Sequence, residues 1–282
     1  WKILSLSNGD LPRKLYPTEP SKQFLSGPVR FKITDVDSGR PVFARVHISD
    51  EKGRYYAPRW HKNIVPTSFG KEVGGDVVVK GKTYAYVEDS FIADLPKGSY
   101  RLEAEKGMEY YPSAHSFDVA LNESKEVHVS LKRWSDMEDE GWYSGDNHIH
   151  HMNGYDALLE MQAEDLRVIN VLGVKNDKRM GQFSGGADPI SLPDRIIYFS
   201  QENTHDWYGH LILNGIQELV YPNAWGDNFW TGVPGGADYP PLAKIASEAQ
   251  QQGGLVTWAH LGVPNGELPI DIALGKIDAL EV

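Results

Sequence analysis

The hydrophobic pattern of this chain changes near residue 141, and the change limits the folds open to each half. Before it, apolar and polar residues alternate in short runs, as at Val29, Phe31 and Ile33, which is the two-residue period of a strand with one buried face. After it, short apolar runs alternate with segments of helical spacing, a pattern typical of β-α units around a largely parallel sheet. The sequence therefore predicts two domains of different fold class.

Residues 28–134 are predicted to form an antiparallel β-sandwich, because each half-buried strand needs a second sheet to cover its apolar face. The runs that carry this prediction lie at residues 29–33, 42–48, 77–79, 83–87, 100–104 and 126–131. Residues 1–27 lack sustained periodicity and are predicted to be an N-terminal arm. The acidic stretch 135–141 is predicted to be the linker to the second domain.

Residues 142–282 are predicted to form an α/β domain. Its clearest helix lies between Pro241 and Gly253, where apolar residues recur at helical spacing. A second helix is predicted at 155–166. Strands are predicted from apolar runs at 168–174, 195–199, 210–213, 255–259 and 277–282. The chain stops inside the last run, so we expect its natural form to continue past Val282.

Composition excludes several classes of partner. The net charge of −11 repels phosphate backbones, so nucleic acid is not expected to bind. No run approaches the roughly 20 apolar residues that cross a bilayer. The absence of cysteine leaves His, Asp, Glu, Asn and water as metal ligands. The chain begins with Trp1 instead of Met, so it is either a processed mature form or a fragment, and we favour a processed protein that is secreted, periplasmic or on the cell surface.

The stretch 145–153 has the spacing of a metal site. If it is a strand, Asp146, His148 and His150 point to the same face. The two imidazoles then start about 6 to 7 Å apart and can converge on one ion at roughly 2.0 to 2.1 Å. Asp146 is a candidate partner that orients a ligating imidazole. The alternative is a histidine-rich loop that binds no metal.

Three further residues lie where such a site would be completed. Glu202 and His260 directly follow apolar runs, which places them at the carboxyl ends of parallel strands, and His210 begins another run. Reactive groups of βα barrels gather at this rim. Each residue alone is more often a satisfied polar residue than a ligand, but in this order they favour a metal centre.

The order of these motifs resembles the polymerase and histidinol phosphatase (PHP) superfamily, most closely its carbaryl-hydrolase and McbA-like branch. The resemblance covers residues 142–282 and implies a distorted (β/α)7 barrel, here truncated at its C-terminus, with one to three divalent metal ions such as Zn, Mn or Fe. By this resemblance the metal ligands are His148, His150, Glu202, His210 and His260.

Two departures from the family pattern affect the expected site. Family members carry Thr-Asp-His after the second strand, where this chain has Val-Lys-Asn-Asp ending at Asp177. Asn176 or Asp177 can supply only oxygen there. The family's late Asp-x-His pair would fall after Val282, which leaves Glu281 as the last candidate for a ligand or for a residue that supports one.

The resemblance implies a metal-dependent hydrolase, because a bound ion activates water without a Ser or Cys nucleophile. The expected substrate is an ester, carbamate or phosphoester of a small molecule or saccharide. His205 and Asp206 are candidates to shuttle protons or orient the water; the alternative is that they cap a loop. Lys175, Trp225 and Trp230 are candidates for the substrate pocket.

The competing hypothesis is a non-catalytic extracellular protein that binds glycans or surfaces, or that assembles, with a degenerate PHP barrel. The first domain resembles carboxypeptidase-regulatory or transthyretin-like modules at residues 39–42 and 95–100. It also holds aromatic residues that either stack on a sugar or pack at a domain interface: Tyr55, Tyr56, Trp60 and His61. The missing histidine near Asn176 favours this hypothesis, whereas the five retained ligands favour the hydrolase.

Overall fold

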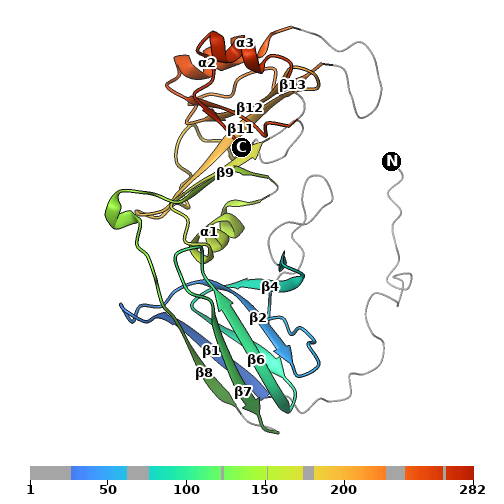
Figure 1. The fold of residues 1–282 in the computed structure, drawn as a ribbon, viewed down its shortest axis with the longest axis vertical. Coiled ribbons are helices and arrows are strands. Elements are labelled where there is room, and N and C mark those ends of the chain that lie inside the picture. Colours follow the sequence, from blue (N-terminus) through green and yellow to red (C-terminus); the bar gives the residue numbers. More distant parts are fainter. Residues whose placement is uncertain are drawn as a thin grey trace, which may run out of the picture.

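The computed structural model describes residues 27–61, 76–121, 124–150, 152–173, 181–226, 239–262 and 265–282. They form two units that lie end to end along the long axis, joined through the segment around η1 (Glu138–Glu140) (Figure 1). No helix among these residues has the length and apolar character needed to span a membrane. Most of the predicted arm and four predicted site residues lie outside the described residues: Lys175, Asn176, Asp177 and Trp230.

The first unit consists of two β-sheets packed face to face. One sheet has the order β5 (Ser90–Leu95), β1 (Gly27–Asp35), β8 (Lys125–Leu131). The other has the order β3 (Asp76–Val79), β4 (Lys82–Val87), β2 (Ala44–Asp50), β6 (Gly98–Glu105), β7 (Ser113–Val119). The alternating residues of β1 point into the space between the sheets, where Val29, Phe31 and Ile33 are fully buried. Apolar alternation thus forms the core of the sandwich.

This sandwich differs from the prediction in two respects. It is not purely antiparallel, because β1 pairs with β8 in parallel. Two of its strands, β5 and β7, lie where no strand was predicted. In β7 the inward positions include Ser113 and His115, so the strand carries too few apolar residues for its period to show in the sequence.

The second unit is built on one mixed sheet. Its strand order is β15 (Ala279–Leu280), β14 (Leu255–Trp258), β12 (Gly209–Asn214), β11 (Ile196–His205), β10 (Val168–Gly173), β9 (Gly145–Ile149), and β13 (Ala224–Trp225) pairs with β11 outside this path. The pairs β9–β10, β10–β11 and β14–β15 are parallel, whereas β12 is antiparallel to both of its neighbours. The helices are α1 (Gly154–Ala163), α2 (Leu242–Gln251) and α3 (Leu268–Ala273).

The predicted (β/α)7 barrel is wrong. Such a barrel has every strand parallel and a helix after each, but the described part of this unit has three α-helices and a reversed central strand, β12. The reversal follows from the connection between β11 and β12, which is the three residues 206–208. A crossover between parallel strands needs a dozen or more residues. A connection of three residues can therefore only return the chain in the antiparallel direction.

The second sheet curls until its two edge strands meet at one corner. β9 and β15 are at opposite ends of the strand order. Nevertheless Glu281, which directly follows β15, has Oε2 2.9 Å from Nδ1 of His148 in β9. Figure 1 accordingly draws the C-terminus beside β9. Residues that are far apart in strand order therefore share one small space.

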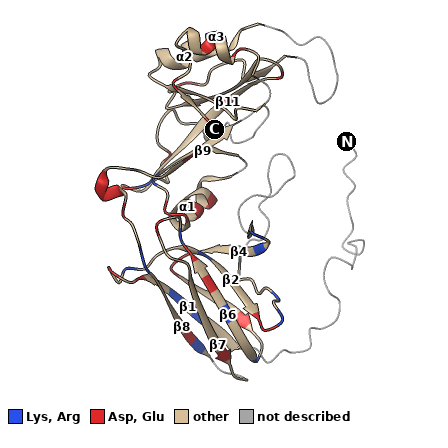
Figure 2. Cartoon of the chain, viewed as in Figure 1, with Lys and Arg blue, Asp and Glu red and all other residues tan. Residues whose placement is uncertain are grey.

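The two units are joined by α1 and by ion pairs across the junction. Arg45 of β2 pairs with Glu105 of its own sheet at 2.7 Å and also with Glu164, which follows α1. Asp165 contacts Arg133 at 2.5 Å and Lys106 at 3.4 Å. Figure 2 shows charge concentrated in the sandwich and at the junction, while most of the second sheet is uncharged.

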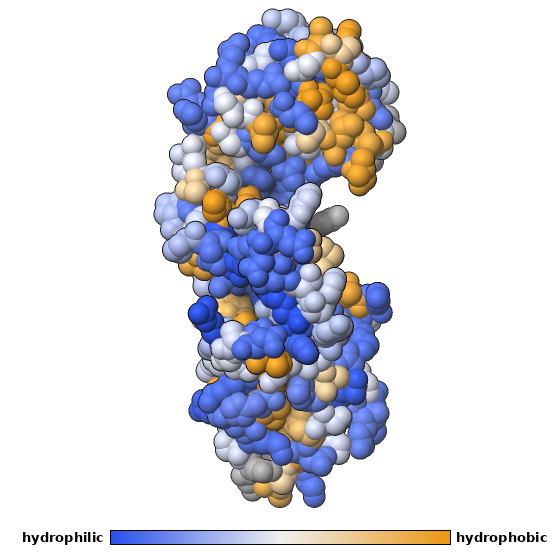
Figure 3. Space-filling model, turned by 60° about the vertical axis from the view of Figure 1, so that its left-hand side comes forward, coloured by the Kyte–Doolittle hydropathy of each residue, from blue (hydrophilic) through white to orange (hydrophobic). Residues whose placement is uncertain are grey.

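The second unit also carries apolar surface. Figure 3 shows a large apolar area on this unit and little on the sandwich in the same view. Three exposed apolar side chains of the second unit lie in α3 or directly after it: Ile270, Ile272 and Leu274.

Candidate metal centre

Five predicted ligands lie together at one corner of the second sheet, and we call them the edge cluster: His148, His150, Glu202, His210 and His260. The two histidines of the His-x-His motif are at the end of β9, and Glu202 lies in β11. His210 is near the start of β12 and His260 is just past β14. An antiparallel strand begins where the preceding strand ends, so the reversal at residues 206–208 places His210 opposite Thr204, which is two positions from Glu202 and on the same face of β11.

Glu202 is the centre of the edge cluster and is only 4% exposed. Its Oε2 lies 3.2 Å from Nε2 of His150. Its Oε1 lies 3.1 Å from Nδ1 of His210 and 3.7 Å from Nε2 of His260. Burial opposes ionisation, but the hydrogen bonds from these three imidazoles outweigh it and hold the pKa of Glu202 well below its usual range. The carboxylate is therefore a buried anion.

The ring nitrogens of the edge cluster approach one another as closely as the ligands of one ion. Nε2 of His148 lies 2.9 Å from Nε2 of His150, and Nδ1 of His210 lies 3.2 Å from Nε2 of His260. Two nitrogens bound tetrahedrally at roughly 2.0 to 2.1 Å are about 3.3 Å apart. The residues form two triads that share Glu202, each with ligand atoms within 4.8 Å of one another. This donor set fits a divalent ion.

Glu281 supports two of these histidines. Its Oε2 lies 2.9 Å from Nδ1 of His148 and accepts the backbone N–H of His260 at 2.9 Å. A carboxylate on the far nitrogen of a ligating imidazole fixes the ring orientation and leaves the other nitrogen for the metal. His260 has φ of +33°, which is rare for a residue other than glycine. Its hydrogen bond to Glu202 raises the pKa of His260.

Asp146 does not occupy the position that simple alternation predicts. A β-bulge interrupts the register between β9 and β10, with Asp146 opposite Ile169 and Ile149 opposite Val171. The extra residue changes which side chains share a face. Oδ1 of Asp146 accepts the backbone N–H of His148 at 3.0 Å, so its contact is with the backbone that carries the ligand.

His205 has the contacts of a turn cap. Its Nδ1 accepts the backbone N–H groups of Trp207 and Tyr208, both at 3.1 Å, and its ring stacks on Tyr208 at 3.8 Å between centroids. It is fully buried and lies three positions after Glu202 in β11, an odd offset that places the two side chains on opposite faces of the strand. Asp206 lies in the same turn. These contacts of His205 are those of a residue that caps the turn.

Trp225 lies in β13, on the side of His205. Its Nε1 donates to the carbonyl of Pro240 at 2.8 Å, and its ring meets His205 edge-on at 5.3 Å. Of the four aromatic residues grouped in the sandwich sequence, Trp60 and His61 line the same cavity, whereas Tyr55 and Tyr56 pack on rings of the sandwich. Tyr56 packs edge-on against Tyr100 at 5.4 Å, whereas Trp60 lines a cavity at the junction.

An asparagine network that was not predicted from the sequence links the strands near the edge cluster. Oδ1 of Asn147 accepts from Nδ2 of Asn214 at 2.6 Å and from Nδ2 of Asn170 at 3.3 Å. Ser200 Oγ donates to Oδ1 of Asn170 at 3.1 Å. These bonds link β9, β10, β11 and β12. Asn170 was the available signal, because it interrupts an otherwise apolar run.

Comparisons with known proteins give no family. No family model and no curated protein matches this chain. Among solved structures, the minor pilin GBS52 of Streptococcus agalactiae matches with 12% identity over 39% of this chain and 46% of its own, at a TM-score of 0.28. The group B streptococcus pilus 2b backbone protein matches with 11% identity over 38% and 41%, at 0.27. This chain thus spans less than half the length of either pilin.

These findings correct the predicted PHP-type hydrolase. The chain matches no family model, and its second sheet is not the parallel barrel on whose rim that activity depended. The assignment to the PHP superfamily and the predicted hydrolysis of an ester, carbamate or phosphoester are therefore wrong.

Proposed function

We propose that this chain is a non-catalytic binding protein of the cell surface or extracellular space, and that its edge cluster holds one or two divalent metal ions. The observation that carries the proposal is the convergence of four imidazoles on the buried carboxylate of Glu202. A divalent cation neutralises that carboxylate and accepts the lone pairs of neutral imidazoles. Protonated imidazoles would also neutralise it, but several of them at these separations repel one another.

Nitrogen and oxygen donors without thiolate suit zinc, manganese or iron. Glu202 offers one carboxylate oxygen to each triad: Oε2 faces His150, and Oε1 faces His210. The shared carboxylate is therefore suited to bridge two ions or to complete the shell of one. Glu281 would position His148 from outside.

The proposed role of the metal is to stabilise the curled sheet by linking its strands. The ligands come from β9 at one edge, from β11 and β12 in the middle and from the end of β14. Such ligands are far apart in an unfolded chain, so the free energy of metal binding becomes free energy of folding. We propose that bound metal stabilises the second unit.

The proposal is tested by elemental analysis after loading with zinc, manganese or iron and removal of free metal. We expect about one equivalent or more in the wild type and loss of it in the double variant His148→Ala, His150→Ala. The matched control is His128→Ala, a sandwich histidine that is 65% exposed and contacts Glu126. Metal below about a tenth of an equivalent after loading, or unchanged content in the double variant, would overturn the proposal.

A further inference from the structure

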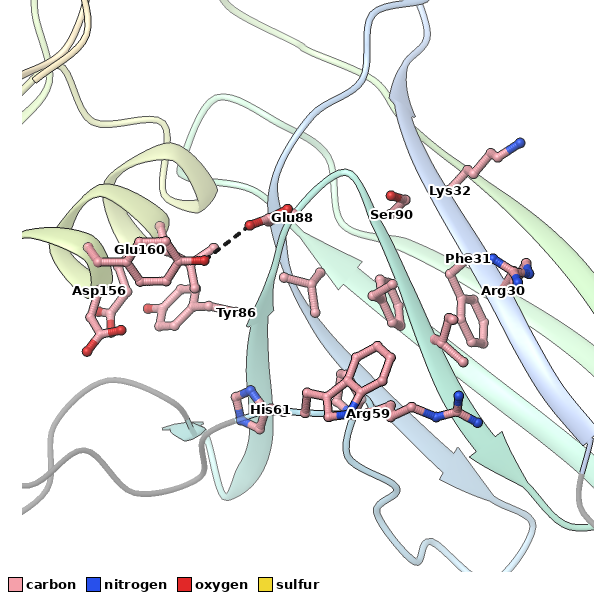
Figure 4. A pocket seen from close by; sticks show the side chains of 17 residues that line it. Arg30, Phe31, Lys32, Arg59, His61, Tyr86, Glu88, Ser90, Asp156 and Glu160 are labelled. Atoms are coloured by element: carbon pink, nitrogen blue, oxygen red, sulfur yellow. Dashed lines mark hydrogen bonds between the residues drawn. The ribbon is translucent and has the colours of Figure 1, made fainter. Parts of the chain in front are cut away.

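A cavity of about 560 Å³ lies at the junction of the two units, and we call it the junction cavity (Figure 4). Its walls come from β1, the segment before residue 62, the end of β4, β5 and α1. Small-molecule sites occupy roughly 300 to 1,000 Å³ and occur preferentially where domains meet. The junction cavity therefore has both the size and the location of a ligand site, and it shares no residue with the edge cluster.

The junction cavity has cationic side chains at one end and carboxyl groups at the other. Figure 4 shows Arg30, Lys32 and Arg59 on one side, and Asp156 and Glu160 of α1 on the other. Lys32 pairs with Glu126 at 3.1 Å, and Arg59 pairs with Asp94. Arg30 is exposed and forms no ion pair with any residue that the structure describes. The cationic end thus has a guanidinium available for an anionic group of a ligand.

An exposed indole, that of Trp60, forms part of the cavity wall. Trp60 is 83% exposed and has φ of +62°, a backbone conformation that bulky residues rarely adopt. No other aromatic ring among the described residues stacks on it or meets it edge-on. The guanidinium of Arg59 lies 5.5 Å from the centroid of its ring. An open indole beside a cation is suited to stack on a flat, partly apolar ligand.

The α1 end offers a neutral carboxyl group. Oε1 of Glu160 is buried and has no hydrogen-bond partner. Burial, together with the charges of Asp156 and Glu164, raises the pKa of Glu160 to about 8. At neutral pH this carboxyl is therefore protonated, so that it can donate one hydrogen bond and accept another. It does not repel an anionic ligand.

We propose that the junction cavity binds an acidic saccharide, a short oligosaccharide of uronic acids. Its carboxylate would pair with Arg30, the C–H face of a ring would stack on Trp60, and hydroxyl groups would exchange hydrogen bonds with Glu160. A sugar hydroxyl is both donor and acceptor, which matches a protonated carboxyl. An acidic peptide satisfies Arg30 equally well but offers no sugar face to the indole.

The test is calorimetric titration of the full chain with trigalacturonic acid and with its methyl ester, which has the same rings without the charge. We expect the acid to bind at least about tenfold more tightly than the ester, as an added charge-assisted contact implies. Arg30→Gln should weaken binding of the acid to the level of the ester and leave the ester unchanged. Trp60→Ala should weaken both ligands by about tenfold.

Three controls separate the proposal from its alternatives. Trp142→Ala removes an indole that is 69% exposed outside the cavity and should leave both affinities unchanged. Glu160→Gln, which mimics the protonated acid, should retain binding, whereas Glu160→Leu should lose it. The double variant His148→Ala, His150→Ala should bind the saccharide like the wild type, so failure of the metal proposal does not affect this test.

Equal affinity for acid and ester would overturn the proposal, as would binding that neither Arg30→Gln nor Trp60→Ala changes. Binding of triglutamate in place of trigalacturonic acid would assign the cavity to an acidic peptide and would also overturn it. Circular dichroism of each variant verifies that loss of binding is not loss of fold.

Discussion

Two buried carboxylates, Asp165 at the junction and Glu202 in the edge cluster, have similar burial but opposite surroundings. Asp165 is 8% exposed and contacts Lys106, Arg133 and Arg195. Glu202 is 4% exposed, and its ion-pair partners among the described residues are all imidazoles. Lysine and arginine bring a charge of their own to the pair, whereas an imidazole is neutral or charged according to its surroundings. The comparison indicates that Asp165 is balanced by the chain itself and that Glu202 is suited to an added cation.

The largest expected effect on the free energy of unfolding comes from replacing Asp165. Asp165→Ala leaves Lys106, Arg133 and Arg195 clustered without their shared anion, and breaking a buried pair in this way costs about 3 to 5 kcal/mol. We expect a loss of that size in the free energy of unfolding, measured by urea denaturation, with no change in metal content. Asp194→Ala, at a carboxylate whose side chain is 59% exposed, is the control and should cost less than about 1 kcal/mol. A small effect at Asp165 would remove the contrast between the two sites.

The next largest expected effect is the loss of the stability that metal binding provides. Glu202→Gln keeps the shape of the side chain and removes its charge, so metal should no longer bind well. With free metal at a hundred times its dissociation constant, the wild type gains about 2.7 kcal/mol from binding, and the variant should lose that gain. Thermal unfolding with and without a chelator measures it. If the chelator shifts the variant and the wild type equally, Glu202 is not a ligand.

Lys106 allows a pH test of the junction. It is 4% exposed, and burial, opposed by Asp165, lowers its pKa to about 8. Between pH 8 and about 10.5 the unfolded chain then holds a proton that the folded chain has lost, so stability from this group rises with pH across that window. The rise is at most about 3 kcal/mol. Lys106→Met should remove it, and urea denaturation at pH 8 and pH 10 should show a flatter dependence than the wild type.

The sequence predicts local structure in this chain better than strand direction. The alternation of Val29, Phe31 and Ile33 identifies β1 because burial on one face imposes a two-residue period. The spacing within residues 242–249 likewise identifies α2. By contrast, an apolar run such as that of β12 is the same whether the strand is parallel or antiparallel. Only the three-residue connection before β12 carries that information.

In the candidate site, too, some features follow from local sequence and others depend on the whole fold. His148 and His150 are two positions apart in the sequence, so their spacing alone places them close together. The contact of His148 with Glu281 depends on the curl of the whole sheet, which brings β9 and β15 together although they are at opposite edges. The junction could not be predicted either. Lys106 and Asp165 belong to different units, and no local pattern relates them.

The smallest expected effect concerns a histidine that resembles the edge cluster in composition but not in surroundings. His128 lies 2.8 Å from a carboxylate, that of Glu126, yet its side chain is 65% exposed and that of Glu126 is 42% exposed. Water screens such a pair, so His128→Ala should change the free energy of unfolding by less than about 0.5 kcal/mol. Its effect on metal content should be nil, because water already solvates Glu126 and no second imidazole among the described residues contacts it. Metal loss in this variant would show that nearness of histidine to carboxylate, and not burial of the anion among several imidazoles, determines where metal binds.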